Sequence, residues 1–124
     1  MLSYRPFPEA LLHSAELRLT GVVAVGDTLR LSFAGEIDLS NAATFADVVL
    51  DAMRQQPHRL VQVGFAEVSF LDSSGIRALL DCWRSAQAQG RRLAVTEVRP
   101  PVRRVLEITG VLDLLGAAEA PTAP

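Results

Sequence analysis

Strand-like and helix-like patterns of apolar residues alternate along this chain, and the alternation restricts it to a small set of folds. Between residues 28 and 37 apolar side chains occupy every second position, which is typical of a strand with one buried face. From Ser40 the apolar spacing becomes that of a helix, until Pro57 ends the run. A strand and a helix then follow twice more before residue 115. This order predicts an α/β fold, a sheet that carries helices.

The first two strands are expected to form an antiparallel hairpin. The runs LRLTGVVAV and TLRLSFAGEI flank Gly26-Asp27, a dipeptide suited to the positive backbone angles of a tight turn. The later crossovers between strands are expected to be right-handed. Ser40 or Asn41 is a natural cap for the first helix, and Pro100-Pro101 suits the first turn of the last one.

Length and composition exclude several classes of protein. A chain of 124 residues, 49% hydrophobic and 21% charged, suits one globular domain. The formal net charge of −2, without a dense basic cluster, argues against nucleic acid as the main partner. No run reaches the ~18 apolar residues of a membrane span, and no leader pattern is present, so we expect a cytoplasmic protein. The single cysteine, Cys82, excludes an internal disulfide, and we expect it to be reduced and buried.

The ends of the chain carry less pattern than its middle. Residues 1–16 are of uncertain structure, and the small, proline-bearing residues 116–124 predict a disordered tail. Apolar residues between these ends are accounted for by stripes that face a core, which favours a monomer.

The stretch SFLDSSGIRALLDCW places an acid, two hydroxyls and a glycine at the junction of a strand and a helix. A helix cap, a catalytic serine and a serine modified by another protein are the three explanations. One cap needs one residue, Asp72 or Ser73, so at least one hydroxyl should remain exposed. Helical spacing predicts an inward and an outward face. The inward face holds Ile76, Leu79, Leu80 and Trp83, and the outward face holds Ser73, Arg77, Asp81 and Arg84.

Enzymatic chemistry at this junction lacks its usual partners. A serine hydrolase needs a base close to the nucleophile, and the two histidines, His13 and His58, lie in the N-terminal segment and in a turn. The G-x-S-x-G pattern is missing, and the absence of lysine rules out a phosphate-binding P-loop. Glu36 and Asp38 without histidine or cysteine support indicate solvated turn residues rather than a metal site. We therefore expect no cofactor, no metal and no enzymatic activity.

Three segments resemble motifs of the STAS domain, the fold of bacterial anti-sigma-factor antagonists. VSFLDSSGIRALL resembles the family signature, FAGEIDLSNA the turn before its first helix, and RPPVRRVLEITGVLDLL its closing segment. The motifs keep the family's order and spacing, so residues 17–115 are identified as a STAS domain. The resemblance implies a single-domain α/β fold with a mixed sheet of four to five strands, helices packed on it and an N-terminal β-hairpin.

The same resemblance implies a switch in transcription regulation. In the family an anti-sigma factor with serine-kinase activity phosphorylates the first serine of D-S-S-G, which is Ser73 here, and a phosphatase is expected to reverse the modification. The alternative is a STAS subunit that docks in a lipid transporter or a stress-sensing complex. One departure is Gly64, which stands where many relatives carry a polar residue, often Asp. The expected partner-binding residues are Asp38, Asp72, Ser73, Ser74, Gly75, Ile76 and Arg77.

Overall fold

The chain forms the antiparallel hairpin that the sequence predicts. In the computed structural model, which describes residues 17–116, strand β1 (Arg18–Val25) turns back at Gly26 and Asp27 into strand β2 (Thr28–Ile37). Gly26 has a φ of 58°, in the left-handed region that glycine enters without a steric penalty. The predictions for residues 1–16 and 117–124 lie outside the described residues.

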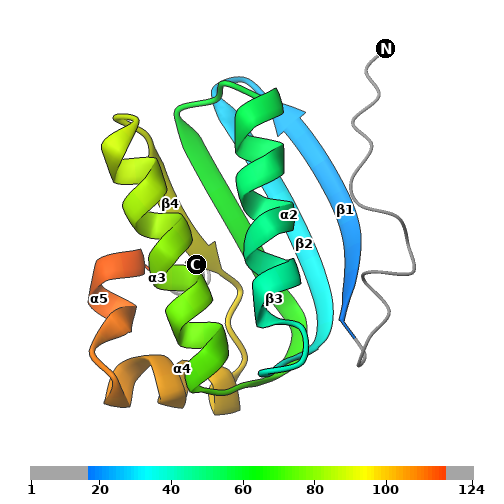
Figure 1. Ribbon diagram of the computed structural model, residues 1–124, viewed down its shortest axis with the longest axis vertical. Helices are drawn as coiled ribbons and strands as arrows, with labels where there is room; N and C mark the ends of the chain where they lie inside the picture. Colours follow the sequence, from blue (N-terminus) through cyan, green and yellow to red (C-terminus); the bar gives the residue numbers. More distant parts are fainter. Residues whose placement is uncertain (1–16, 117–124) are drawn as a thin grey trace, which may run out of the picture.

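After the hairpin, helices and strands alternate, and the sheet has the order β1-β2-β3-β4 (Figure 1). Helix α2 (Ala42–Gln55) leads to strand β3 (Leu60–Leu71), and helix α3 (Ser73–Ala88) leads to strand β4 (Arg92–Thr96). β3 pairs in parallel with both β2 and β4, whereas β1 and β2 are antiparallel. The predicted α/β fold with a mixed sheet is confirmed, and the sheet has four strands in the described residues.

Two short helices follow the sheet, and the second was not predicted as a separate element. Helix α4 (Pro100–Ile108) begins with two prolines, at positions where a missing N–H leaves no helical bond unmade. Gly110, with a φ of 78°, then redirects the chain into helix α5 (Val111–Leu115). Five residues are too few for an apolar period to distinguish a helix from a loop.

Helices α2 and α3 run side by side across one face of the sheet, and the core lies between them and that face (Figure 1). Its largest members are aromatic: the ring centroid of Phe45 lies 4.8 Å from that of Phe33 and 6.0 Å from that of Phe65. Such edge-on and tilted pairs add to the free energy of burial. The core therefore joins the first helix to both central strands.

Helix α3 is rotated relative to the predicted orientation. Leu79 is buried as expected, but Leu80 and Trp83, which we expected to be buried, only pack against the rim of the core. Cys82 takes the inward position instead, and its thiol donates a 3.8 Å hydrogen bond to the carbonyl of Ala46 in α2. The buried face of α3 also holds the small side chains of Ala78 and Ala86, whereas Leu80 and Trp83 are half-buried. Cys82 is free and buried as predicted, and burial raises the pKa of its thiol to about 12.

Candidate functional site

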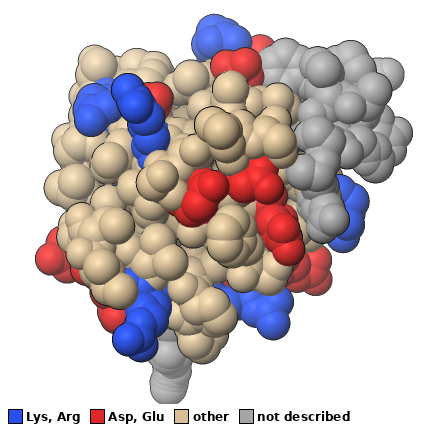
Figure 2. Space-filling view, turned by 60° about the horizontal axis from the view of Figure 1, so that its bottom comes forward, with Lys and Arg blue, Asp and Glu red and all other residues tan. Residues whose placement is uncertain are grey.

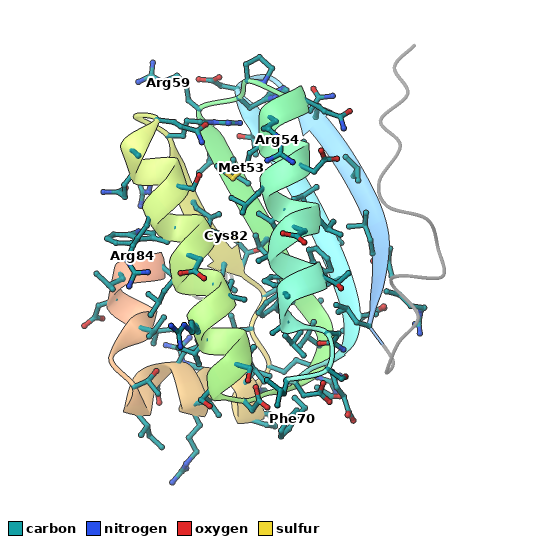
Figure 3. All side chains as sticks on the ribbon, in the orientation of Figure 1. Met53, Arg54, Arg59, Phe70, Cys82 and Arg84 are labelled. Carbon is teal, nitrogen blue, oxygen red and sulfur yellow. The ribbon has the colours of Figure 1, made fainter. Side chains whose placement is uncertain are left out.

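Two strand ends and two helix starts meet at one end of the molecule (Figure 3). In the parallel register of β2 and β3, Ile37 lies opposite Leu71, the last residue of each strand. The N–H of Asp72 donates to the carbonyl oxygen of Ile37 at 3.3 Å. The turn after β2, with Asp38, and the DSSG turn after β3 are therefore neighbours, although more than thirty residues separate them in the chain.

Asp72 is the cap of helix α3. Its Oδ1 accepts hydrogen bonds from the backbone N–H groups of Ser74 at 2.8 Å and Gly75 at 3.1 Å. Two of the free N–H groups of the first turn are satisfied in this way. Ser73 is left as the first helical residue, exposed, and its hydroxyl forms no hydrogen bond within residues 17–116. The expectation of one unused, accessible hydroxyl is confirmed.

Gly75 is required by packing beneath the turn. A Cβ atom placed on Gly75 would lie 2.3 Å from Cδ1 of Leu71, which would force that side chain to move, and 3.0 Å from Cγ2 of Ile37, which is a tight contact. Ile76 is also buried, with 7% of its surface exposed. Of the expected partner-binding residues, these two lie below the surface. Asp38, Asp72 and Ser74 are half-buried, and Ser73 and Arg77 are exposed.

The turn before helix α2 is built around a buried amide. Asn41 has 1% of its surface exposed; its side-chain oxygen accepts from the N–H of Asp38 and its NH₂ donates to the carbonyl of Glu36, both at 3.0 Å. Asp38 in turn accepts from the N–H and the hydroxyl of Ser40, at 2.9 and 2.6 Å. Asn41 occupies the cap position as predicted, but its side chain does not bond to the helix. It holds the turn instead.

The polar groups of this end do not form a hydrolytic site or a metal cluster within the described part of the chain. His58 precedes the twelve-residue strand β3, whereas Ser73 follows it, which separates them by roughly 35–40 Å at ~3.3 Å per residue. That distance excludes His58 as the base for Ser73. Residues 17–116 hold no group of three or more His, Cys, Asp or Glu placed to bind a metal ion. His13 lies outside the described residues.

Sequence reasoning missed two apolar side chains beside this site. Leu39, in the turn after β2, is 81% exposed, and Phe70, near the end of β3, is 46% exposed. Figure 3 shows Phe70 at the end of the molecule where α3 begins. Phe70 lies opposite Glu36 in the strand register, on the face of the sheet away from the core. The signal for Phe70 was its position next to buried Leu71, because neighbouring strand residues point to opposite faces.

Gly64 lies in the middle of β3, away from the end of the strand that carries Ser73. The guanidinium of Arg30 covers it, and a Cβ atom on Gly64 would lie 3.3 Å from Nη2 of that arginine. Arg30 also forms an ion pair with Glu97. A shift in register between β2 and β3 follows directly after Gly64. Gly64, which departs from the family pattern, thus leaves room for the guanidinium of Arg30 and does not border Ser73.

The fold and the sequence agree with those of known proteins. The family model described as the STAS domain matches residues 20–123, and the chain therefore belongs to the STAS domain family. It is 26% identical over 87 residues to the anti-sigma F factor antagonist of Paenibacillus polymyxa, covering 70% of this chain and 73% of that protein. It is 27% identical over 93 residues to the anti-sigma-B factor antagonist of Staphylococcus epidermidis, covering 75% and 85%.

Solved structures show the same fold. The anti-sigma factor antagonist SpoIIAA in its unphosphorylated form superposes with a TM-score of 0.68 at 24% identity, covering 81% of this chain and 86% of that one. The phosphorylated form of the Bacillus protein of the same name gives a TM-score of 0.61 at 23% identity, with 81% and 89% covered. In residues 17–116 no helix is long and apolar enough to cross a membrane.

Proposed function

We propose that this protein is an anti-sigma-factor antagonist that binds a serine-kinase anti-sigma factor and is switched off by phosphorylation of Ser73. The observation that carries the proposal is the exposed hydroxyl of Ser73, which has no hydrogen-bond partner within residues 17–116, at a turn whose capping is already performed by Asp72. Relatives named as anti-sigma factor antagonists support the same class of function. The protein acts as a cytosolic binding module, and the partner kinase supplies the chemistry.

The position of Ser73 tolerates a phosphate. Transfer of the γ-phosphoryl group of ATP to Ser73 Oγ, with loss of the hydroxyl proton and release of ADP, adds about −1.5 to −2 charges. The N-terminus of helix α3 interacts favourably with negative charge. Arg77, one turn along, is exposed and forms no hydrogen bond or ion pair in the described residues, so it is available to the phosphate. Asp72 opposes the added charge, but the fold is expected to survive.

The proposed contact surface contains Ser73 and its polar neighbours from both turns. These neighbours are Asp38, Asp72, Ser74 and Arg77, which are half-buried or exposed, while Gly75 and Ile76 are buried beneath the turn. A phosphatase that removes the phosphate resets the switch. Because the contact surface coincides with the modified residue, phosphate and partner compete for the same space.

Phosphorylation is tested with the purified kinase-type anti-sigma factors of the same cell, ATP and magnesium. We expect one added phosphate by intact-mass measurement, and fragmentation should place it on Ser73. Ser73→Ala protein should stay unmodified, whereas Ser74→Ala, the matched control one residue away, should accept the phosphate. Equal modification of the Ser73→Ala protein, or phosphate found on Ser74 alone, would contradict the proposal.

Binding provides the second test. Ser73→Asp should bind the anti-sigma factor at least about a hundredfold more weakly than the parent, a difference of ~2.7 kcal/mol. Ser73→Ala should bind and resist inactivation by ATP. Calorimetric titration measures both affinities, and circular dichroism melts check that both variants remain folded. If Ser73→Asp binds as tightly as the parent, the switch is refuted and a docking role in a transporter or a stress-sensing complex is favoured.

A further inference from the structure

The turn after β2 presents an apolar side chain on a rigid backbone. Leu39 has the highest exposed fraction, 81%, among the large apolar residues that the structure describes. Hydrogen bonds fix the residues on either side of Leu39. The side-chain oxygen of Asn41 accepts from the N–H of Asp38, and the carboxylate of Asp38 accepts from the N–H and the hydroxyl of Ser40. A side chain displayed on an ordered turn loses little backbone freedom when it enters a pocket of a partner.

Phe70 is displayed in the same way on the neighbouring strand. Its backbone belongs to β3, paired with Glu36 of β2, and 46% of its surface is exposed. Ser73 follows three residues later, and the N–H of Asp72 bonds to the carbonyl of Ile37, two residues before Leu39. Leu39 and Phe70 therefore come from the two strand ends that also position Ser73.

Three carboxylates lie at the same strand ends as Leu39 and Phe70. Glu36 and Asp38 lie at the end of β2, and Asp72 lies at the end of β3. Figure 2 shows acidic side chains gathered in the middle of this end of the molecule, with basic ones toward its margins. Carboxylates thus outnumber the one exposed cation, Arg77, in the proposed contact surface before any phosphate is added. A partner with an acidic surface would be repelled in both states, so it would bind neither form.

A phosphate can also weaken binding by placing a charge inside an apolar contact from which water is excluded. We propose that Leu39 and Phe70 are the apolar anchors of the partner contact, received by an apolar pocket with basic groups at its rim. Resting on the proposed function, this inference assigns the effect of the phosphate to its burial beside those anchors rather than to long-range repulsion. A charge removed from water without an adequate partner is costly, whatever the salt concentration.

Anchor residues are tested by calorimetric titration against the purified kinase-type anti-sigma factor. Leu39→Ala and Phe70→Ala should each weaken binding by about tenfold or more, as interface anchors do. Val25→Ala is the matched control, because Val25 is 67% exposed but lies beside the hairpin turn at the other end of β2. We expect its affinity to stay within about twofold of the parent. Circular dichroism melts check that all three variants remain folded at the temperature of the titration, with the largest shift expected for Phe70→Ala because part of that ring is buried.

Salt dependence distinguishes a spoiled contact from repulsion. The affinity lost in Ser73→Asp should persist between about 0.1 and 0.5 M sodium chloride, because screening acts on exposed charges and much less on buried ones. Recovery of Ser73→Asp binding at high salt, or parent-like binding by Leu39→Ala and Phe70→Ala, would overturn the inference. Neither of these two results contradicts the proposed function, provided that Ser73→Asp binds the anti-sigma factor weakly at low salt. Failure of the parent itself to bind would refute the proposed function and this inference together.

Discussion

The junction between β2 and α2 and the junction between β3 and α3 contain similar residues, IDLSN and LDSSG, but use them differently. In the first, the acid Asp38 bonds to the N–H and the hydroxyl of Ser40, and the buried amide of Asn41 ties the turn together. In the second, Asp72 bonds to two N–H groups of the helix, and the hydroxyl of Ser73 has no partner in the part of the chain that the structure describes.

This difference explains how two adjacent turns take different roles. A serine whose hydroxyl is already bonded at 2.6 Å, as in Ser40, must give up that bond before it reacts. The hydroxyl of Ser73 has no hydrogen bond to break within the described residues. The first junction is therefore a rigid support, and the second carries the accessible group. Substitutions in the two junctions should separate these roles.

The largest effect is expected for Asn41→Ala in the first junction. The change leaves the N–H of Asp38 and the carbonyl of Glu36 without their partner, and each unsatisfied group costs about 1–3 kcal/mol. We expect the free energy of unfolding, from chemical denaturation, to fall by about 2–4 kcal/mol. The control is Gln55→Ala, which removes an exposed amide that bonds to Asp51. This variant should change the free energy of unfolding by less than about 0.5 kcal/mol. An Asn41→Ala midpoint equal to that of the parent would show that the turn does not depend on the amide.

Gly75→Ala should be the next largest, because the new methyl group meets Leu71 and Ile37. Overpacking of this kind costs about 1–3 kcal/mol. The matched site is Thr44, which occupies the same position of the first turn of α2 and is half-buried. Thr44→Ala should stay within about 0.5 kcal/mol of the parent in the same denaturation experiment. Equal stabilities of Gly75→Ala and the parent would mean that the turn yields to the methyl group without strain.

Asp72→Ala tests the cap of helix α3. Loss of a capping side chain typically costs about 1 kcal/mol, within a range of roughly 0.5–2 kcal/mol. Asp72→Asn should retain most of the stability, because asparagine caps a helix about as well as aspartate. Thermal and chemical denaturation measure the stabilities of the two variants. If Asp72→Asn is as unstable as Asp72→Ala, the negative charge rather than the hydrogen bonds stabilises the helix.

The smallest effect is expected for Ser73→Ala, whose stability should lie within about 0.5 kcal/mol of the parent. Ser40→Ala, the corresponding serine of the first junction, should cost about 0.5–1.5 kcal/mol because its hydroxyl bonds to Asp38. A loss for Ser73→Ala as large as that for Ser40→Ala would show that the Ser73 hydroxyl is not free in solution.

Local features of this fold were predictable from the sequence. The hairpin follows from Gly26-Asp27 between two strand-like runs, and a cap at Asp72 or Ser73 follows from polar residues directly before a helical pattern; the structure shows that Asp72 is the cap. Both depend on residues a few positions apart in the chain. The existence of one unused hydroxyl followed from counting polar groups against a single cap, before any packing was known.

The orientation of helix α3 and the role of Gly64 were not predictable in this way. Leu80 and Trp83 fit the inward stripe by spacing, yet Cys82, which bonds to Ala46 of α2, takes the inward position. Gly64 stands where many relatives of the STAS family carry a polar residue, but the space above it is occupied by Arg30 from the neighbouring strand. In both cases a residue far away in the sequence decided the outcome.

The sequence by itself determined the hairpin, the alternation of strands and helices up to α4, and the presence of at least one unused hydroxyl in the DSSG turn, because these depend on backbone preferences and hydrogen bonds over a few residues. The tertiary structure decided which side chains lie near Ser73. Only the parallel register of β2 and β3 brings Asp38 and Leu39 to the same end as Phe70 and Ser73. The physical reason is that sheet pairing joins segments by backbone hydrogen bonds, whose register no local pattern in either segment specifies.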